Sequence, residues 1–181
     1  MSATFNTLHL VRDFSNKINM QANAITTFTL RYDLIEDRMC LDVLKDDGLG
    51  EKIYITRRLA NGIIAELGRR IESLPARVIP TEFIQEQAVQ SKTPVAAVEI
   101  HEGSPSWLLK TMHIAPKDNQ LMITLTDDES HAVEFQASEH LFRNMLEFFW
   151  VNFNIGEWTT EHFPTWFVEA KLSPVSAATL N

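Results

Sequence analysis

The most constraining feature of this sequence is a change of apolar period between residues 52 and 74. Before Thr56, Ile53 and Ile55 occupy alternate positions, as on one face of a β-strand. After it, apolar residues recur three or four positions apart, as on one face of an α-helix: Leu59, Ile63, Ile64, Leu67, Ile71 and Leu74. Thr56 itself is a residue type that caps helix N-termini. The stretch therefore predicts a short strand that leads directly into an amphipathic helix over residues 57–74.

The same change of period returns 82 positions further along the chain, in residues 131–153. Phe135 falls opposite Ile53, and Ser138, another capping residue type, falls opposite Thr56. We therefore predict an α+β protein with a tandem pseudo-repeat of antiparallel strands, each repeat followed by one amphipathic helix. The second helix is expected over residues 139–153. The alternative interpretation is two unrelated strand-to-helix units.

Alternating apolar residues and turn signals place the strands of each unit. An Asp-Gly pair at residues 47–48 predicts a hairpin turn in the first unit. The first unit is expected to hold four strands, at residues 7–11, 26–33, 39–43 and 52–55. The second is expected to hold four more, at residues 95–100, 107–114, 120–125 and 132–137.

These expectations divide the chain into four parts. Residues 1–74 form the first unit, and residues 95–156 form the second. The connector between them, residues 75–94, contains three prolines and a short helix that begins at Thr81. Residues 157–181 form an aromatic C-terminal segment that ends in a flexible tail.

The charge of the chain is uneven, which bears on its partners. The net charge is −8, and residues 91–181 hold only 5 Lys or Arg against 12 Asp or Glu. This surplus of acid in the second half disfavours a nucleic-acid partner. No apolar run reaches the roughly 18–20 residues that cross a bilayer, so no membrane contact is expected. Without a secretory signal, and with Cys40 as the one cysteine, the expected setting is the cytoplasm and the expected thiol is buried and inert.

The patterns of known catalytic and metal sites are missing from this sequence. His101 precedes Glu102, but no second histidine follows at the spacing of a metalloprotease helix. His131 lies in an acidic hairpin tip that lacks the ordered ligand spacing of a calcium loop. Neither a glycine-flanked nucleophilic serine nor a glycine-rich phosphate loop occurs. We therefore expect a protein that is not an enzyme and that has no catalytic residues, metal ligands or cofactor.

One alternative function follows from the predicted layout. Four strands and a helix, repeated once, resemble the layout of the Whirly-like single-strand-binding fold, and this resemblance implies a single-stranded nucleic-acid-binding protein. The candidate basic patch for this alternative consists of arginines on the first predicted helix: Arg57, Arg58, Arg69 and Arg70.

The aromatic C-terminal segment favours a different function. Four large side chains fall within ten residues: Trp158, Phe163, Trp166 and Phe167. Pro164 interrupts any helix there, and the segment follows two completed units, so these side chains are candidates for a protein interface. Folding back into the core is the alternative. From this pattern we expect a non-catalytic protein-binding or assembly subunit, or an adaptor, that contacts a protein partner or a second copy of itself.

Overall fold

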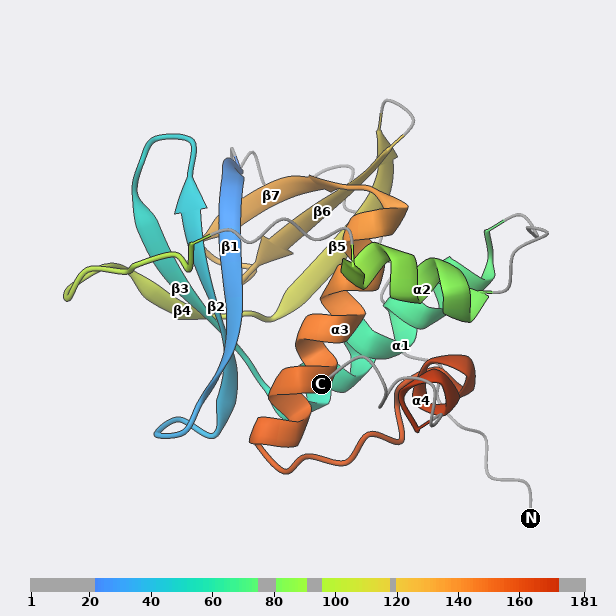
Figure 1. The fold of residues 1–181 in the computed structure, drawn as a ribbon. Coiled ribbons are helices and arrows are strands. Elements are labelled where there is room, and N and C mark those ends of the chain that lie inside the picture. Colours follow the sequence, from blue (N-terminus) through green and yellow to red (C-terminus); the bar gives the residue numbers. More distant parts are fainter. Residues whose placement is uncertain (1–21, 75–80, 91–95, 118–119, 173–181) are drawn as a thin grey trace, which may run out of the picture.

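The computed structural model describes residues 22–74, 81–90, 96–117 and 120–172 (Figure 1). In these ranges the chain forms seven strands and four helices, a mixed α+β layout. The strands are β1 (Asn23–Asp33), β2 (Arg38–Lys45), β3 (Gly50–Ile55), β4 (Ser106–Leu108), β5 (Thr111–Lys117), β6 (Gln120–Thr126) and β7 (Ala132–Ala137). The helices are α1 (Arg57–Glu72), α2 (Thr81–Gln90), α3 (Glu139–Ile155) and α4 (Thr165–Leu172).

The seven strands form one sheet in the order β4-β3-β2-β1-β7-β6-β5. Two antiparallel meanders, β1–β2–β3 and β5–β6–β7, meet where β1 and β7 run parallel, and this contact is only two residue pairs long. β4 pairs with β3 at one end of the order, and β5 pairs with β6 at the other end. Only two residues of the chain, Leu109 and Lys110, separate β4 from β5. Because so short a link joins the two ends of the order, the sheet curls round on itself (Figure 1).

The two long helices cover one face of the curled sheet. α1 and α3 pack against each other, and α2 lies beside α3 on the side away from β1 (Figure 1). Thr56 accepts a hydrogen bond from the backbone of Leu59, and Ser138 accepts one from Leu141, so both predicted N-caps are confirmed. The apolar stripes of both helices are buried in one core with the inward-facing residues of the strands.

The second unit departs from its predicted strands at two places. Residues 96–100, expected as a strand, lie outside the sheet and cross β1 toward β3. Val98 donates its backbone N–H to the side chain of Thr29 instead of a strand partner. The strand expected over residues 107–114 is broken into β4 and β5 by Leu109 and Lys110, because its two halves pair with different strands. The strand expected at residues 7–11 lies outside the described residues.

Most of the aromatic C-terminal segment packs into the core. The side chains of Trp158, Phe163 and Phe167 are buried, whereas Trp166 is half-buried. Phe163 stacks on Phe167 with 5.6 Å between ring centroids. An interface through the three buried side chains would require the segment to leave the core, so only Trp166 offers surface to a partner. Pro164 lies just before α4 and accepts hydrogen bonds from its first turn instead of interrupting it.

Two glycines of α1 offer a matched test of this packing. A Cβ at Gly68 would overlap the ring of Pro164, so Gly68→Ala should lower the free energy of unfolding by about 1–3 kcal/mol. A Cβ at exposed Gly62 meets nothing within 4 Å. Gly62→Ala should therefore raise the free energy of unfolding by about 1 kcal/mol through helix propensity. Urea denaturation of both variants measures the difference, and stabilisation by both would show that Pro164 does not rest on α1.

Candidate functional site

The feature that best qualifies as a site is a groove between β1 and β7. The two strands pair at Asn23 with Val133 and at Ala24 with Glu134, and then separate. From Ile25 onward β1 is paired with β2 on one side, and among the described residues no strand pairs with its other edge. The groove that opens there has a volume of about 1000 Å³.

Uncharged side chains form most of the walls. β1 contributes residues 24–30, the crossing segment contributes Ala96 and Ala97, and α3 contributes the face that contains Asn144 and Phe148. Of the eighteen lining residues, two carry a full charge at neutral pH, Lys117 and Glu134. The groove is therefore close to neutral, and backbone atoms of the open strand edge form part of its surface.

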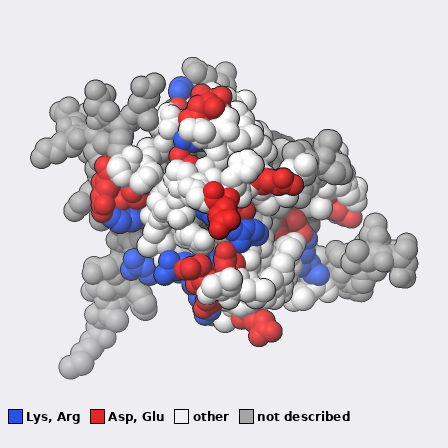
Figure 2. Space-filling view, turned by 90° about the vertical axis from the view of Figure 1, so that its left-hand side faces the viewer, with Lys and Arg blue, Asp and Glu red and all other residues white. Residues whose placement is uncertain are grey.

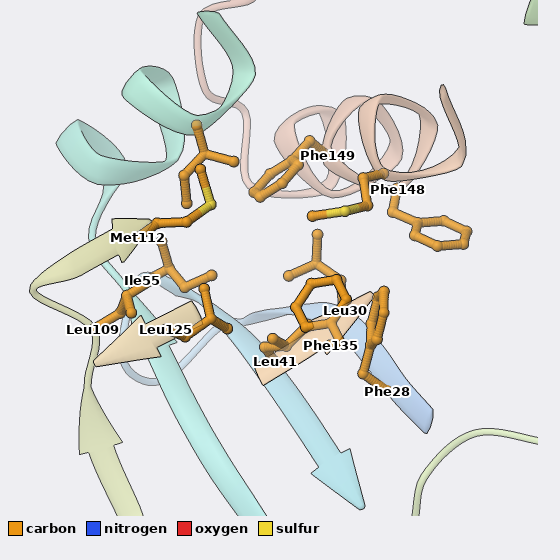
Figure 3. Close-up of a pocket in the computed structure, with 12 residues that line it drawn as sticks. Phe28, Leu30, Leu41, Ile55, Leu109, Met112, Leu125, Phe135, Phe148 and Phe149 are labelled. Atoms are coloured by element: carbon orange, nitrogen blue, oxygen red, sulfur yellow. The ribbon is translucent and has the colours of Figure 1, made fainter. Parts of the chain in front are cut away.

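Aromatic side chains separate the groove from the core. Phe28 and Phe135 lie with ring centroids 5.5 Å apart, and both line the groove and a small cavity beneath it. The cavity has a volume of about 20 Å³ and twelve lining residues, all of them apolar. Figure 3 shows their side chains converging from the strands and both long helices, with the ring of Phe148 turned away from the others. A void of this size without polar partners does not hold water, so it belongs to the core.

α3 continues the groove toward the C-terminal end of β1. Asn152 donates from Nδ2 to the backbone oxygen of Leu30, at 3.2 Å, and so holds the helix beside the open edge of β1. Val151 and Ile155 follow Phe148 at helical spacing, on the same face of α3 as the groove-lining residues. Both are unusually exposed for their type, at 48% and 55%.

The turn between β1 and β2 adds two more exposed apolar residues, Leu34 at 79% and Ile35 at 94%. This turn is held against the end of α3, because the ring of Tyr32 packs on Trp158 and would touch any side chain at position 156. We call the exposed set the apolar rim; its members are Leu34, Ile35, Val151 and Ile155. The groove is poor in charge, whereas Leu34 and Ile35 of the rim lie between charged residues of the turn, Asp33 and Glu36.

One lining residue carries an unpaired polar atom. The side-chain oxygen of Asn144 is buried and has no hydrogen-bond partner within the described ranges. Its side-chain nitrogen lies 3.1 Å from Nδ1 of His140, which is also a lining residue. A buried acceptor without a partner costs about 1–3 kcal/mol, so an asparagine at this position is unfavourable for stability alone.

The structure does not bring the four predicted arginines together. Arg57 and Arg58 lie at the start of α1, and Arg69 and Arg70 lie in its last turn, about 18 Å away along the axis. Both arginines of the last turn bond to Glu66. The guanidinium of Arg57 lies 4.7 Å from the centre of the Trp158 ring. On the face shown in Figure 2, basic and acidic side chains alternate without a wide basic area.

Two clusters of ionisable groups lie outside the groove. Lys45 and Glu51 form a buried ion pair at 2.6 Å, and Glu51 also accepts from the indole nitrogen of Trp107. Next to Trp107, His131 bonds to Asp127 at 2.8 Å. Burial alone would raise the pKa of Asp127, but His131 and three backbone N–H groups outweigh it and hold that pKa well below its usual value. These contacts fix a corner of the sheet.

The thiol of Cys40 is poorly suited to act as a nucleophile. Cys40 is buried, as expected, and burial is the main reason why its pKa is raised to about 12. A thiol with so high a pKa is not a nucleophile at neutral pH. Across the described ranges, His, Cys, Asp and Glu side chains nowhere gather in threes as metal ligands do.

Known proteins offer no guide to the function of this chain, which we therefore infer from the groove. Protein-family models, curated proteins and solved structures were all compared with this chain, and none matches it. Within the described residues, every helix is too short or too polar to cross a membrane. The groove itself was not foreseen from the sequence, although its low charge is visible in residues 23–30 and in the Ala96–Ala97 pair.

Proposed function

We propose that this protein is a non-catalytic subunit or adaptor that binds another protein through the groove and the apolar rim. The observation that carries the proposal is the rim itself. Four large apolar side chains lie exposed beside a charge-poor groove, at the end of β1 and of α3. Clustered exposed apolar residues next to a cleft are typical of protein interfaces, whereas isolated ones are ordinary.

The electrostatics support a protein partner over a nucleic acid. The described lining of the groove carries one positive and one negative group, so it offers a phosphate chain no net attraction. The arginines of α1 are divided between its two ends, and those of the last turn are paired with Glu66. Trp166, the half-buried member of the C-terminal aromatic set, is a separate candidate contact for a partner, and its indole nitrogen donates to Glu72.

A charge placed on the rim tests the proposal. Val151→Glu puts a carboxylate at a 48% exposed position, so folding should be unaffected while partner affinity falls at least about tenfold. Partners captured from isotope-labelled lysate on the unmodified protein and on the variant identify which protein is lost. Calorimetric titration of that protein then gives the change in affinity.

Ala65→Glu serves as the matched control, because Ala65 is an exposed helical position on α1 outside the groove and the rim. It should leave partner binding unchanged. A single-stranded oligonucleotide, titrated over a salt series, tests the alternative function. Tight, salt-sensitive binding of that oligonucleotide, together with equal protein capture by Val151→Glu and Ala65→Glu, would favour the nucleic-acid-binding function over the proposed one.

We also infer that the two strand-to-helix units are a tandem pseudo-repeat. Support comes from the parallel contacts of the sheet, where Ala24 pairs with Glu134 and Ser106 pairs with Lys52. Positions 24 and 106 are 82 residues apart, as are positions 52 and 134. Further support comes from Arg70 on α1 and Asn152 on α3, also 82 apart, each of which donates to a strand carbonyl of the other unit.

A further inference from the structure

We propose that the groove binds an extended segment of a partner protein, and that this segment pairs with the open edge of β1 as an added strand. The inference rests on the proposed function in one respect, that the partner is a protein. It adds the form in which the partner binds and the atoms that recognise it.

The backbone of β1 is oriented for such pairing. In an antiparallel strand the N–H and C=O of one residue point to the same side, and successive residues alternate between the two sides. Asn152 of α3 bonds to the carbonyl of Leu30, so the backbone N–H and C=O of Leu30 point away from β2. By the same alternation Phe28 presents its N–H and C=O to the groove, and in the described part of the chain no strand takes them up.

The size of the groove suits an extended chain. Residues 25–29 of β1 are five residues of edge before the Leu30 carbonyl that Asn152 occupies, which correspond to about 17 Å of strand. The volume of about 1000 Å³ is at the upper limit for small-molecule pockets. Across the groove, Ala96 and Ala97 present side chains that end at Cβ, so a backbone can approach β1 without displacing large groups.

The charges indicate which sequence the segment has. Lys117 and Glu134 cancel, and the remaining lining residues are apolar or neutral, which matches the neutral backbone and uncharged side chains of a peptide. Alternate side chains of an added strand point to one face. Those that face Phe28 and Phe148 are expected to be apolar, and the segment is expected to lack acidic runs.

The experiment uses a displayed library of random twelve-residue peptides, selected on the 181-residue chain. Selected peptides are then synthesised with a single N-methyl group at each position in turn, which removes one backbone donor at a time. Strand pairing predicts that affinity falls at least about tenfold at every second position along the paired stretch and little at the positions between.

Ala97→Trp tests whether the groove holds the peptide. Ala97 is an exposed lining residue outside the core, so a tryptophan there should fill the groove, preserve the thermal midpoint and weaken peptide binding at least about tenfold. Ala65→Trp places the same side chain on the exposed face of α1 and should leave peptide affinity unchanged. Hydrogen exchange of the amides of Phe28 and Leu30 should slow when the peptide is bound.

The outcomes separate this inference from the proposed function. Peptides that bind, are blocked by Ala97→Trp and show no alternation under N-methylation would overturn strand pairing and leave protein binding intact. A library that yields no binder overturns the inference, and the rim test above then decides the function by itself. Concentration-dependent dimerisation that Ala97→Trp abolishes would make a second copy the occupant and overturn the proposal of a partner segment.

Discussion

Phe153→Ala is expected to lower the free energy of unfolding by about 3–5 kcal/mol, the usual cost of truncating a buried phenylalanine. The Phe153 side chain is fully buried. Its ring centroid lies 5.1 Å from that of Trp158 and 5.4 Å from that of Phe163, so it joins α3 to the C-terminal segment. Truncation leaves a cavity among aromatic rings that cannot collapse without moving α4. Chemical denaturation followed by circular dichroism measures the loss.

Val151→Ala is the matched control, because it shortens an apolar side chain on the same helix at an exposed position. It should change the free energy of unfolding by no more than about 0.5 kcal/mol. A loss below about 1 kcal/mol for Phe153→Ala would mean that the C-terminal segment does not depend on this ring for its place in the core. The C-terminal segment would then again be a candidate for a protein interface.

Glu51→Leu is expected to cost a similar amount, about 3–5 kcal/mol, because it leaves a buried cation without its nearest partner. The side chains of Lys45 and Glu51 are 7% and 9% exposed, and their charged atoms lie 2.6 Å apart. Asp47, at 3.5 Å from the same nitrogen, is much more exposed and compensates little. Burial tends to lower the pKa of Lys45, but Glu51 and Asp47 raise it overall. Urea denaturation of the variant at neutral pH gives the cost.

The double variant Lys45→Met/Glu51→Leu distinguishes the cost of removing the whole ion pair from the cost of leaving Lys45 unpaired. Replacing both charges by apolar groups of similar size removes the unpaired cation, so most of the stability should return. A residual cost of about 1 kcal/mol is expected, because the indole nitrogen of Trp107 donates to Glu51 and loses its acceptor. A double variant as unstable as Glu51→Leu would show that packing around these side chains matters more than their charges.

The elements that were predicted correctly are those whose cause is local. The change of period at Thr56 and at Ser138 marks where α1 and α3 begin, because cap and apolar stripe both act within one or two turns. The Asp-Gly pair likewise fixes the turn between β2 and β3, with Gly48 at a positive φ of 80°. These signals require no knowledge of distant residues.

The elements that were predicted incorrectly are those decided by partners far away in the chain. Residues 96–100 alternate like a strand, yet they cross over β1, where Val98 bonds to the side chain of Thr29 instead of pairing along a strand edge. The run at residues 107–114 is divided because β3 takes one half and β6 takes the other. The aromatic residues after Gly156 were open to two interpretations, interface or core, and the burial of three of them depends on the space left beside α3.

Local patterns account for the two strand-to-helix transitions, both helix caps, the apolar faces and the low charge of residues 23–30, because each depends on residues within a few positions of one another. The meeting of β1 and β7 for two residue pairs, and their separation beyond them, depends on how distant parts of the chain pack. That separation leaves the edge of β1 open and brings α3 and the crossing segment around it. A groove of this kind has no local signal, because its walls come from parts of the chain more than sixty residues apart and meet only when the sheet curls.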